Sequence, residues 1–503
     1  MSSATPDEHG DRFYLSQHIR LVEQRAMSEL LLSEQALMQR AGEAALDAIQ
    51  HCYSAIKSLQ IFCGTGNNAG DGYTLASLAR AEGWRVSIVQ VGEMHSPSTS
   101  TQAAIAAAEQ ADIPILPFAS PMPIDADLLV DAMLGIGFKA PLRAPFPAAI
   151  LRMNQSGRPI LALDVPSGLS ADTGAAAQTT VQADTTITFI GKKLGLVTGA
   201  GPQHVGQLKL ATLALPNSLL DTMPVTARAL QLAAMQAYLP PRARNAHKGD
   251  FGHVLIVGGS QGFGGAVMLS AAAALRAGAG LVSVATSPTH VMPLLARMPE
   301  VMAHGINNIA QMQQLVTQAS VIVVGPGLGQ TPWGKGLFAA CLQAGKPLIV
   351  DADALTMLAA MPCQQAHWIL TPHPGEAARL LGCDTAAINR ARLKSAQAIS
   401  KRYGGVCVLK GAGSLVTRGQ RDVSVCLAGN PGMASGGMGD LLAGLLGGLL
   451  AQGLGLDIAA KVGVQIHASA ADLAARPSGE RGLVASDLLP YVQRLVNASD
   501  YPA

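Results

Sequence analysis

The chain has 503 residues, of which 49% are hydrophobic and 14% charged, and its formal net charge is +2. This composition excludes an intrinsically disordered protein, because disorder requires low hydrophobicity and a high net charge. It also excludes an integral membrane protein, because no apolar run reaches the roughly 18 residues that cross a bilayer. At about 150 residues per domain, the length predicts three domains or two large ones.

The beginning of the chain and its cysteines bear on where the protein works. Acidic residues occur in the first 20 positions, where a secretory signal would have a basic region followed by an apolar one. The seven cysteines are scattered and never form a Cys-x-x-Cys pair, which favours buried reduced thiols over disulfides or a zinc site. We therefore expect a cytoplasmic protein.

Charge is divided unevenly along the chain. Residues 1–225 contain 14 basic and 20 acidic residues, whereas residues 226–503 contain 21 basic and 13 acidic residues. The basic residues of the second half are dispersed and aromatic residues make up only 4% of the chain, so no nucleic-acid surface is expected. A small phosphorylated ligand fits this pattern better.

Short β-rich runs alternate with Ala- and Leu-rich helical stretches, which is the pattern of parallel sheets covered by helices. The predicted fold class is therefore α/β. The predicted strands are 59–63, 85–91, 128–134, 160–165 and 185–190 in the first half, and 253–259, 281–286, 321–325, 347–353, 368–372 and 406–411 in the second. The stretch 213–232 contains prolines and no strand pattern, so we place a boundary near residue 225, between domains 1–225 and 226–503.

A glycine-rich loop, GTGNNAGDG (64–72), directly follows the strand predicted at 59–63 and precedes an amphipathic stretch. Open α/β sheets bind ligands at such places, because free backbone N–H groups and the helix dipole attract anions. Asn67, Asn68 and Asp71 add side-chain donors, acceptors and a charge, which a bare turn would hardly need. The loop is thus predicted to bind a ligand.

Two further predicted strands of the first half end in an acid. Asp131 precedes a glycine turn in VDAMLGIG, and Asp164 precedes Val165, Pro166, Ser167 and Gly168 in DVPSGLSADTG. The ends of neighbouring parallel strands meet at one edge of a sheet, so these acids would offer oxygen ligands for a cation and a carboxylate for proton transfer.

The second half contains several glycine-rich loops after predicted strands. The strongest is GNPGMASGGMGD (429–440), which leads directly into an apolar helix. Its successive N–H groups would form an anion-binding nest for a transferring phosphoryl group, with Asp440 as the base for an attacking hydroxyl. The loop GGSQGFGGA (258–266) is no P-loop, because no Lys-Ser/Thr pair closes it, and it is a weak signal alone.

The sequence leaves the role of one histidine open and favours a structural role for another. His373 lies between two prolines in TPHPGE, where a turn residue and a ligand contact are equally plausible. His467 lies in a long apolar stretch, which favours a histidine of the protein core.

Taken together, these motifs resemble a known pair of enzyme families. GTGNNAGDG, VDAMLGIG and DVPSGLSADTG resemble the NAD(P)HX epimerases, also called the YjeF N-terminal domain. HKGDFGHVLIVGGS, GPGLG, DADAL, TPHPGE, KGAGS and GNPGMASGGMGD resemble the ADP-dependent NAD(P)HX dehydratases. The resemblance spans residues 10 to 500 approximately, and it implies a Rossmann-like three-layer sandwich followed by a ribokinase-like α/β domain.

The resemblance implies that NADHX and NADPHX, the hydrated forms of NADH and NADPH, are the substrates. For the epimerase site it implies K⁺ at Asn68, Asp131 and Ser167, and Asp164 as the proton-handling acid. It further implies that the hydrate's phosphates and ribose are bound by two segments: Asn67, Asn68, Ala69, Gly70 and Asp71, and Gly135, Ile136, Gly137, Phe138, Lys139, Ala140 and Pro141. Ala69 departs from the glycine that is usual in this family.

For the dehydratase site the resemblance implies Asp440 as the base and ADP with Mg²⁺ as the source of the phosphoryl group. It places the hydrate at Ala266, Gly327, His373 and Asp440, and the nucleotide at Lys410, Gly411, Ala412, Gly413, Ser414 and Gly439. Ser414 and Ser435 stand where threonine is common. We also expect a homo-oligomer.

Two alternatives remain open from the sequence. The second half could be a vitamin-type small-molecule kinase, because thiazole and pyrimidine kinases share the GxGD helix start. The first half could be a binding module without catalysis, although the presence of Asn68, Asp131 and Asp164 argues against this. The sequence does not decide between NADHX and NADPHX or show whether the two sites communicate.

Overall fold

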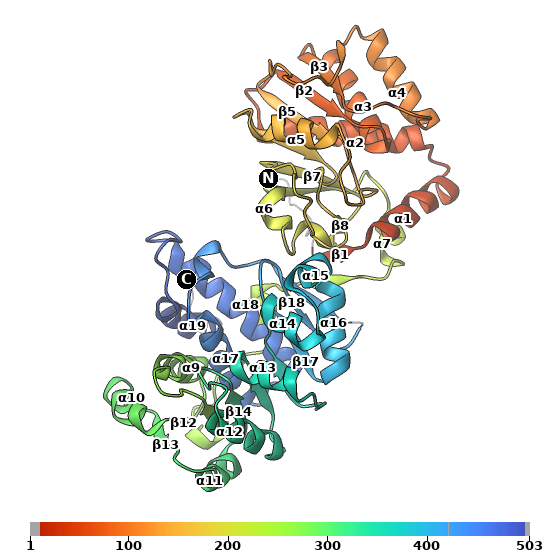
Figure 1. Cartoon of the computed structure of the whole chain (residues 1–503). Helices are drawn as coiled ribbons and strands as arrows, with labels where there is room; N and C mark the ends of the chain where they lie inside the picture. The colour runs from red at the N-terminus through yellow and green to blue at the C-terminus, as the bar shows by residue number, and fades with distance from the viewer. Residues whose placement is uncertain (1–10, 421, 498–503) are drawn as a thin grey trace. The chain divides into compact units, whose positions relative to one another are not determined.

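The computed structural model of the chain describes residues 11–420 and 422–497. It divides into two compact units, Met1–Arg228 and Ala229–Ala503. In Figure 1 the first unit runs from red to yellow-green and the second from green to blue. Both units are built on parallel sheets with helices around them, which confirms the predicted α/β class.

The main sheet of the first unit is entirely parallel, with strand order β4-β3-β2-β5-β6-β7-β9. Its strands are β2 (Ser58–Cys63), β3 (Arg85–Gln90), β4 (Ile115–Pro117), β5 (Leu128–Ala132), β6 (Ile160–Leu163), β7 (Thr185–Phe189) and β9 (Gln207–Ala211). A short ribbon contains β1 (Arg12–Tyr14), which pairs with β8 (Lys192–Lys193) and β10 (Ala227–Ala229).

Helices cover both faces of this sheet. They are α1 (Ser16–Glu29), α2 (Glu34–Cys52), α3 (Asn67–Ala81), α4 (Thr99–Gln110), α5 (Phe146–Asn154), α6 (Gly201–Val205) and α7 (Asn217–Asp221). Side chains alternate along β2, so Ile61 packs with the helices α1 to α4, whereas Phe62 packs on the opposite face with α5. The result is the three-layer arrangement expected from the sequence.

In the second unit the strand order is β13-β12-β11-β14-β15-β16-β17-β18-β19. The strands from β13 to β17 are parallel, and β18 and β19 are antiparallel additions. Their bounds are β11 (His253–Val257), β12 (Leu281–Thr286), β13 (Met302–Gly305), β14 (Val321–Val324), β15 (Leu348–Val350), β16 (Trp368–Leu370), β17 (Val406–Leu409), β18 (Ser414–Thr417) and β19 (Val423–Cys426).

The helices of this unit connect and cover these strands. They are α8 (Leu232–Gln236), α9 (Gly264–Ala277), α10 (Val291–Arg297), α11 (Ala310–Gln318), α12 (Pro332–Gln343), α13 (Ala352–Ala360), α14 (Pro374–Leu381), α15 (Thr385–Arg390), α16 (Arg392–Tyr403), α17 (Met438–Ala451), α18 (Leu456–Ala475) and α19 (Leu489–Leu495). Among the described residues, no helix has both the length and the apolar character needed to cross a membrane.

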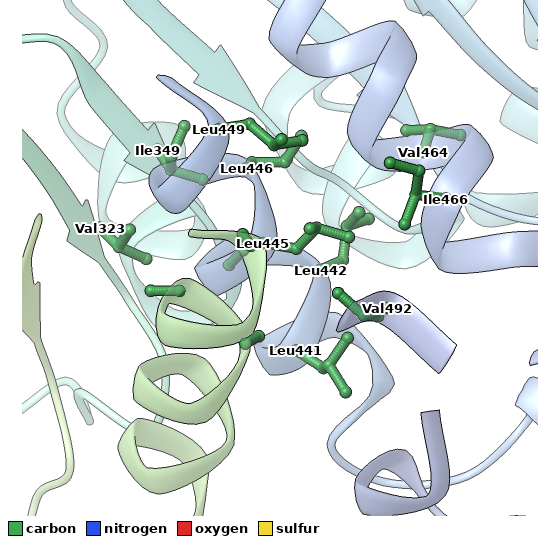
Figure 2. Close-up of a cluster of buried hydrophobic side chains, with 14 of the residues drawn as sticks. Val323, Ile349, Leu441, Leu442, Leu445, Leu446, Leu449, Val464, Ile466 and Val492 are labelled. Carbon is green, nitrogen blue, oxygen red and sulfur yellow. The ribbon is translucent and has the colours of Figure 1, made fainter. Parts of the chain in front are cut away.

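The apolar helix α17 is central to the second core. Its leucines, among them Leu441, Leu445 and Leu449, are fully buried and pack against Val323 and Ile349 of the sheet and against α18 (Figure 2). Figure 2 also shows Val492 of α19 at the edge of this cluster. Residues 441–450 of α17 are all buried, and their sequence is accordingly apolar on every side of the helix instead of amphipathic.

The helices α9 and α17 touch through their backbones. A Cβ atom on Gly444 would lie 1.9 Å from the carbonyl oxygen of Ser270, and one on Gly448 would lie 2.7 Å from that of Ala274. The hydroxyl of Ser270 also donates a 2.8 Å hydrogen bond to the carbonyl oxygen of Asp440. The glycines of α17 therefore allow an approach that no other residue type would permit.

Candidate active sites

The first site lies where the strand order of the first sheet reverses, between β2 and β5. Open α/β sheets bind ligands at such a point, at the carboxyl ends of the strands. The loop after β2 leads into α3, whose second residue is Asn68, and β5 and β6 end beside Asp131 and Asp164. The structure thus brings the three predicted segments to one edge of the sheet.

Asn68, Asp131 and Ser167 form a buried polar cluster at this edge. The Asp131 carboxylate accepts hydrogen bonds of 2.7 Å from both the backbone N–H and the hydroxyl of Ser167, and one of 3.1 Å from the N–H of Met133. Burial nevertheless raises the pKa of Asp131 to about 6. The amide nitrogen of Asn68 donates to the carbonyl oxygen of Leu163 at 3.3 Å, whereas its side-chain oxygen is buried without a partner among the described residues.

Asp164 is held by a lysine that the sequence motifs do not contain. The Lys193 ammonium group lies 2.5 Å from Asp164 Oδ1, and it also donates to the Thr188 hydroxyl and the Phe189 carbonyl oxygen, both at 2.9 Å. Lys193 is fully buried. Asp164 itself has a backbone φ of +64°, a conformation that is rare for a residue with a side chain.

Further carboxyl groups surround this ion pair. Burial and the negative charges of Asp164 and Glu23 raise the pKa of Asp71 well above its usual value, although Lys193 opposes this. Burial and Asp164 likewise raise the pKa of Glu23, on α1, to about 7. The site therefore combines the ion pair of Lys193 and Asp164 with two carboxyl groups whose pKa values are raised.

Of the other residues predicted for the first site, some adjoin the polar cluster and others are exposed to solvent. A Cβ on Gly135 would lie 3.4 Å from Asn68 Cβ and 3.6 Å from Asp164 Oδ2, so this turn adjoins the site. Lys139, Ala140 and Pro141 are exposed. Asn67 is exposed and donates a 2.7 Å hydrogen bond to Glu34 on α2.

Ala69 and Gly70 contribute no side chain to a binding surface. Ala69 is fully buried in the core of the first unit, and a Cβ on Gly70 would meet the terminal methyl of Met38 at 2.4 Å. The backbone N–H of Ala69 already donates a 3.0 Å hydrogen bond to the carbonyl oxygen of Gly66.

The second site is centred on Lys410, at the end of β17. Its ammonium group lies 2.9 Å from Asp351 Oδ1 and 3.8 Å from Glu376 Oε2. Burial opposes the charged form of Lys410, but Asp351 and Glu376 outweigh it and hold the pKa of Lys410 above its usual value. Asp351 is also held by the Thr371 hydroxyl at 2.7 Å, and burial raises the pKa of Glu376 to about 7.

Asp440 lies in the first turn of α17, beside this cluster. Burial and the charge of Asp351 raise the pKa of Asp440 to about 6, and Lys410 acts in the opposite direction. A Cβ on the preceding Gly439 would lie 3.2 Å from the Lys410 nitrogen and 3.5 Å from Asp351 Oδ2. The predicted base and the predicted nucleotide loop, 410–414, are therefore adjacent.

The buried side chain of Arg392 supports the predicted nucleotide loop, 410–414. Arg392, of α16, donates to the carbonyl oxygens of Lys410 and Gly413 at 3.3 and 3.4 Å, and its burial lowers its pKa to about 10. The Ser414 hydroxyl closes the same loop with a 2.9 Å bond to the Gly411 carbonyl oxygen. On the other side, a Cβ on Gly327 would lie 3.1 Å from that of Ala266, which brings these two predicted residues together.

His373 has a structural role as the N-cap residue of α14. Its Nδ1 accepts a 3.0 Å bond from the N–H of Gly375, and its own N–H donates to Glu376 at 2.8 Å. Half of the side chain remains exposed, and burial together with Lys410 and Arg379 lowers the pKa of His373. The turn interpretation holds, and contact with a ligand stays a prediction.

His467, on α18, is buried as the sequence suggests, but it is not satisfied on both nitrogens. Its Nε2 has no partner among the described residues. Burial and the nearby Lys410 lower its pKa to about 4, so this histidine is neutral at physiological pH.

Sequence reasoning missed several residues that the structure places in these sites. Asp351 lies near the end of the predicted strand 347–353 and directly follows β15, which is the kind of signal that identified Asp131 and Asp164, so it could have been found. Lys193 follows a strand in a Lys-Lys pair that has no distinguishing pattern, and Arg392 lies in an ordinary charged helix. The missed residues are Glu23, Lys193, Asp351, Thr371, Glu376 and Arg392.

Comparison with known proteins assigns a family to each unit. Residues 34–195 match the family described as YjeF-related protein N-terminus, and residues 254–494 match the family described as NAD(P)H-hydrate dehydratase. The "Bifunctional NAD(P)H-hydrate repair enzyme Nnr" of Coxiella burnetii is 45% identical over 484 residues, which cover 96% of this chain and 99% of that protein.

Two solved structures are similar to part of the chain. A ribokinase-like superfamily protein from Enterococcus faecalis is 28% identical with a TM-score of 0.51, covering 55% of this chain and 98% of that one. An ADP/ATP-dependent NAD(P)H-hydrate dehydratase from Bacillus subtilis, co-crystallised with ATP/Mg²⁺, is 26% identical with a TM-score of 0.49, covering 55% of this chain and 99% of that one.

Proposed function

The chain belongs to the family of bifunctional NAD(P)H-hydrate repair enzymes, and from this we propose how its residues divide the two reactions. The first unit epimerises the R and S forms of hydrated NADH or NADPH. The second unit dehydrates the S form at the expense of a nucleotide. The observation that carries this assignment is that each unit places one acid, Asp164 or Asp440, among charged groups at its own ligand edge.

We propose that Asp164 transfers the proton in the first site. One of its oxygens is occupied by Lys193, Thr188 and the N–H of Phe189, and its other oxygen faces Gly135. General acid–base catalysis by a positioned carboxylate contributes about 10²–10⁴-fold to a rate. The backbone N–H groups at the start of α3 would bind the phosphates of the hydrate.

The polar cluster beside Asp164 fits a hard monovalent cation. The Asn68 side-chain oxygen is buried and lacks a partner among the described residues, and the Asp131 carboxylate and the Ser167 oxygen lie at the same edge. Oxygen donors of this kind suit K⁺. We propose that these three residues would hold K⁺, which would supply positive charge near the phosphates of the hydrate.

We propose that Asp440 takes the proton from the ring hydroxyl of the hydrate in the second site. The hydroxyl oxygen attacks the terminal phosphorus of ADP and AMP leaves. The C–O bond then breaks, inorganic phosphate departs and the neighbouring ring carbon loses a proton, so that the double bond of NAD(P)H forms. Hydroxide is a poor leaving group and phosphate a good one, which explains the need for a nucleotide. Lys410 would pair with the nucleotide's phosphates.

The residues of this site fit Mg²⁺ only as a partner of the nucleotide. Within residues 11–420 and 422–497, no group of three His, Cys, Asp or Glu side chains is arranged to hold a metal. Mg²⁺ commonly binds through one or two carboxylates together with substrate phosphates. We propose that Mg²⁺ would arrive on the phosphates, where it would shield their charge.

We also propose ADP as the preferred nucleotide, the cytoplasm as the location and a homo-oligomer as the assembly. The resemblance of the motifs of the second unit to those of the ADP-dependent dehydratases supports the first of these.

The test is recovery of reduced cofactor from chemically hydrated NADH. The R/S mixture is incubated with the protein, with and without ADP, and absorbance is followed at the reduced-nicotinamide band. We expect complete recovery with ADP and none without it. Formation of a stable phosphorylated product without reduced cofactor would instead identify a small-molecule kinase.

A further inference from the structure

Lys193 uses all three of its N–H donors in the interior of the first unit. They contact Asp164 Oδ1 at 2.5 Å, Thr188 Oγ1 at 2.9 Å and the Phe189 carbonyl oxygen at 2.9 Å. The side chain is 1% exposed, so its ammonium group is inaccessible to a ligand of any size. Lys193 therefore acts only on its protein neighbours.

Among the described residues, every hydrogen-bond donor to the Asp164 carboxylate bonds to the same oxygen, Oδ1. Oδ1 receives Lys193, the Thr188 hydroxyl at 3.2 Å and the N–H of Phe189 at 3.3 Å. No hydrogen bond to Oδ2 occurs among the described residues. Oδ2 instead lies 3.6 Å from the position that a Cβ of Gly135 would occupy, on the side of the ligand loops. The two oxygens of this carboxylate are thus in different environments.

Two tight turns bring the pair together. At Asp164 (φ +64°) the N–H of Val165 bonds to the carbonyl oxygen of Leu163 at 2.8 Å, and at Ile190 (φ +68°) the N–H of Gly191 bonds to that of Phe189 at 2.7 Å. Such turns are rare for residues with side chains, above all for a β-branched one. They persist only where the surroundings hold them. The second turn returns the chain after β7, so that β8 directs Lys193 toward Asp164.

We propose that Lys193 is the positioning residue of the epimerase site, which fixes Asp164 through Oδ1 so that Oδ2 is the oxygen that exchanges the proton with the hydrate. This inference rests on the proposed role of Asp164. It deepens that role by naming the reacting atom and the group that orients it.

Several other charged groups face this pair. Asp71 of α3 and Glu23 of α1 both interact with Lys193 and Asp164, and Arg20 and Glu34 interact with Glu23. Lys193 is the cation that the three carboxyl groups Glu23, Asp71 and Asp164 share. Without its charge, Glu23 and Asp71 bind protons more readily. Loss of Lys193 should therefore move the acid side of the epimerase pH profile upward.

The experiment uses the full chain with Lys193→Met. Conversion of the R epimer is coupled to an excess of a second full-length variant, Asp164→Asn, whose dehydratase site is intact, with ADP present. We expect the epimerase kcat to fall about 10²-fold, the cost of displacing a reacting group by about 1 Å. KM should stay within about threefold, and the half-activity pH on the acid side should rise. Lys193→Arg, which keeps the charge, should retain more activity than Lys193→Met.

Two further variants keep the result interpretable. Lys209→Met makes the same chemical change in a half-exposed lysine of β9 and should leave epimerisation unchanged. Thr188→Val removes one donor to Oδ1 and should lower kcat several-fold, with a smaller pH shift. If Lys193→Met does not fold, Lys193→Arg and Thr188→Val still test the proposal.

Three results would overturn the inference: wild-type kcat and pH profile in Lys193→Met, a change in KM alone, or equal losses in Lys193→Met and Lys193→Arg without a pH shift. The proposed function is tested separately by the unaltered protein and by Asp164→Asn. If the first interconverts R and S and the second does not, the function stands, and any failure at Lys193 concerns the positioning role alone.

Discussion

Lys410 and Asp351 form an ion pair of 2.9 Å between the predicted nucleotide loop and the end of β15. Asp351 is 2% exposed, and its second oxygen lies near Gly439, next to Asp440. The pair therefore connects the group that would bind phosphate with the acid that would act as the base. A change in either partner should affect both nucleotide binding and the stability of the second unit.

Lys410→Met should raise the KM for ADP about tenfold or more, because a hydrogen bond to a charged group contributes about 1.5–3 kcal/mol. It should also lower the stability of the second unit, because Asp351 and Glu376 lose their cation. Steady-state kinetics with the S epimer and thermal unfolding measure these effects. The double variant Lys410→Met/Asp351→Asn should recover part of the stability but not the nucleotide affinity. An unchanged KM for ADP would contradict the role given to Lys410.

The rate of dehydration should fall as the pH is lowered through about 6, because the pKa of Asp440 lies near that value and only its carboxylate accepts a proton. The contribution of Asp440 to the stability of the fold changes with pH in the opposite direction. A carboxyl group whose pKa is higher in the folded state than its ordinary 3.8 stabilises the fold below 3.8, and this contribution is lost as the pH rises through 6.

The measurement is kcat/KM for the S epimer between pH 5 and 8 at saturating ADP. Glu376 has a pKa of about 7 in the same site, so Glu376→Gln separates its contribution. The fall near pH 6 should persist in Glu376→Gln. A rate that stays constant over this range would show that Asp440 is not the base.

Epimerisation should depend on potassium, because Asn68, Asp131 and Ser167 offer only oxygen donors. Replacing K⁺ with a bulky organic cation at constant ionic strength should slow the R-to-S conversion and leave dehydration of the S epimer unchanged. Asn68→Ala should remove the potassium dependence. Equal epimerisation rates in both salts would eliminate the cation site.

Asp164→Asn and Asp440→Asn should each slow one reaction strongly and leave the other unchanged. Each fall should reach the roughly 10²–10⁴-fold that general base catalysis contributes. Because each unit has its own sheet and core, a mixture of the two variants should repair an R/S mixture completely as the intermediate diffuses between molecules. If repair stops when the S fraction is consumed, the assignment of the two acids or the independence of the units is wrong.

Ala69→Gly restores the residue that is usual in this loop and should destabilise the first unit. Ala69 is fully buried inside α3, where glycine costs about 0.5–1 kcal/mol relative to alanine. Epimerase kcat should not change, because the Ala69 side chain lies in the core. Thermal unfolding measures the loss of stability, and the coupled assay measures the epimerase kcat. Ala76→Gly makes the same change at another fully buried alanine of α3 and is the matched control.

The parallel core strands and the acids at their ends were predictable from the sequence, because strands buried on both faces have continuous apolar runs. Short edge strands were not. The strand β9 is half exposed and contains Lys209, and β18 and β19 pair antiparallel at one edge of the second sheet. Their patterns are too short or too polar to distinguish them from loops.

The residues that orient the predicted acids also could not be predicted from the sequence. Lys193 reaches Asp164 only because the chain turns at Ile190, and an isoleucine gives no signal for a turn of positive φ. Arg392 supports the nucleotide loop from 18 residues away in the chain, to the carbonyl oxygen of Lys410. Such contacts depend on tertiary folding and leave no local periodicity.

The close contact between α9 and α17 has a consequence for genetic variation. Ser270 holds the backbone of Asp440, and Gly444 leaves the space that brings these two helices together. A missense change at Gly444 would touch no substrate, yet it would push apart the helices that carry Ala266 and Asp440. Mutations that inactivate the dehydratase should therefore also occur at the glycines of α17 that contact α9, Gly444 and Gly448. These positions lie a full helical turn or more from Asp440.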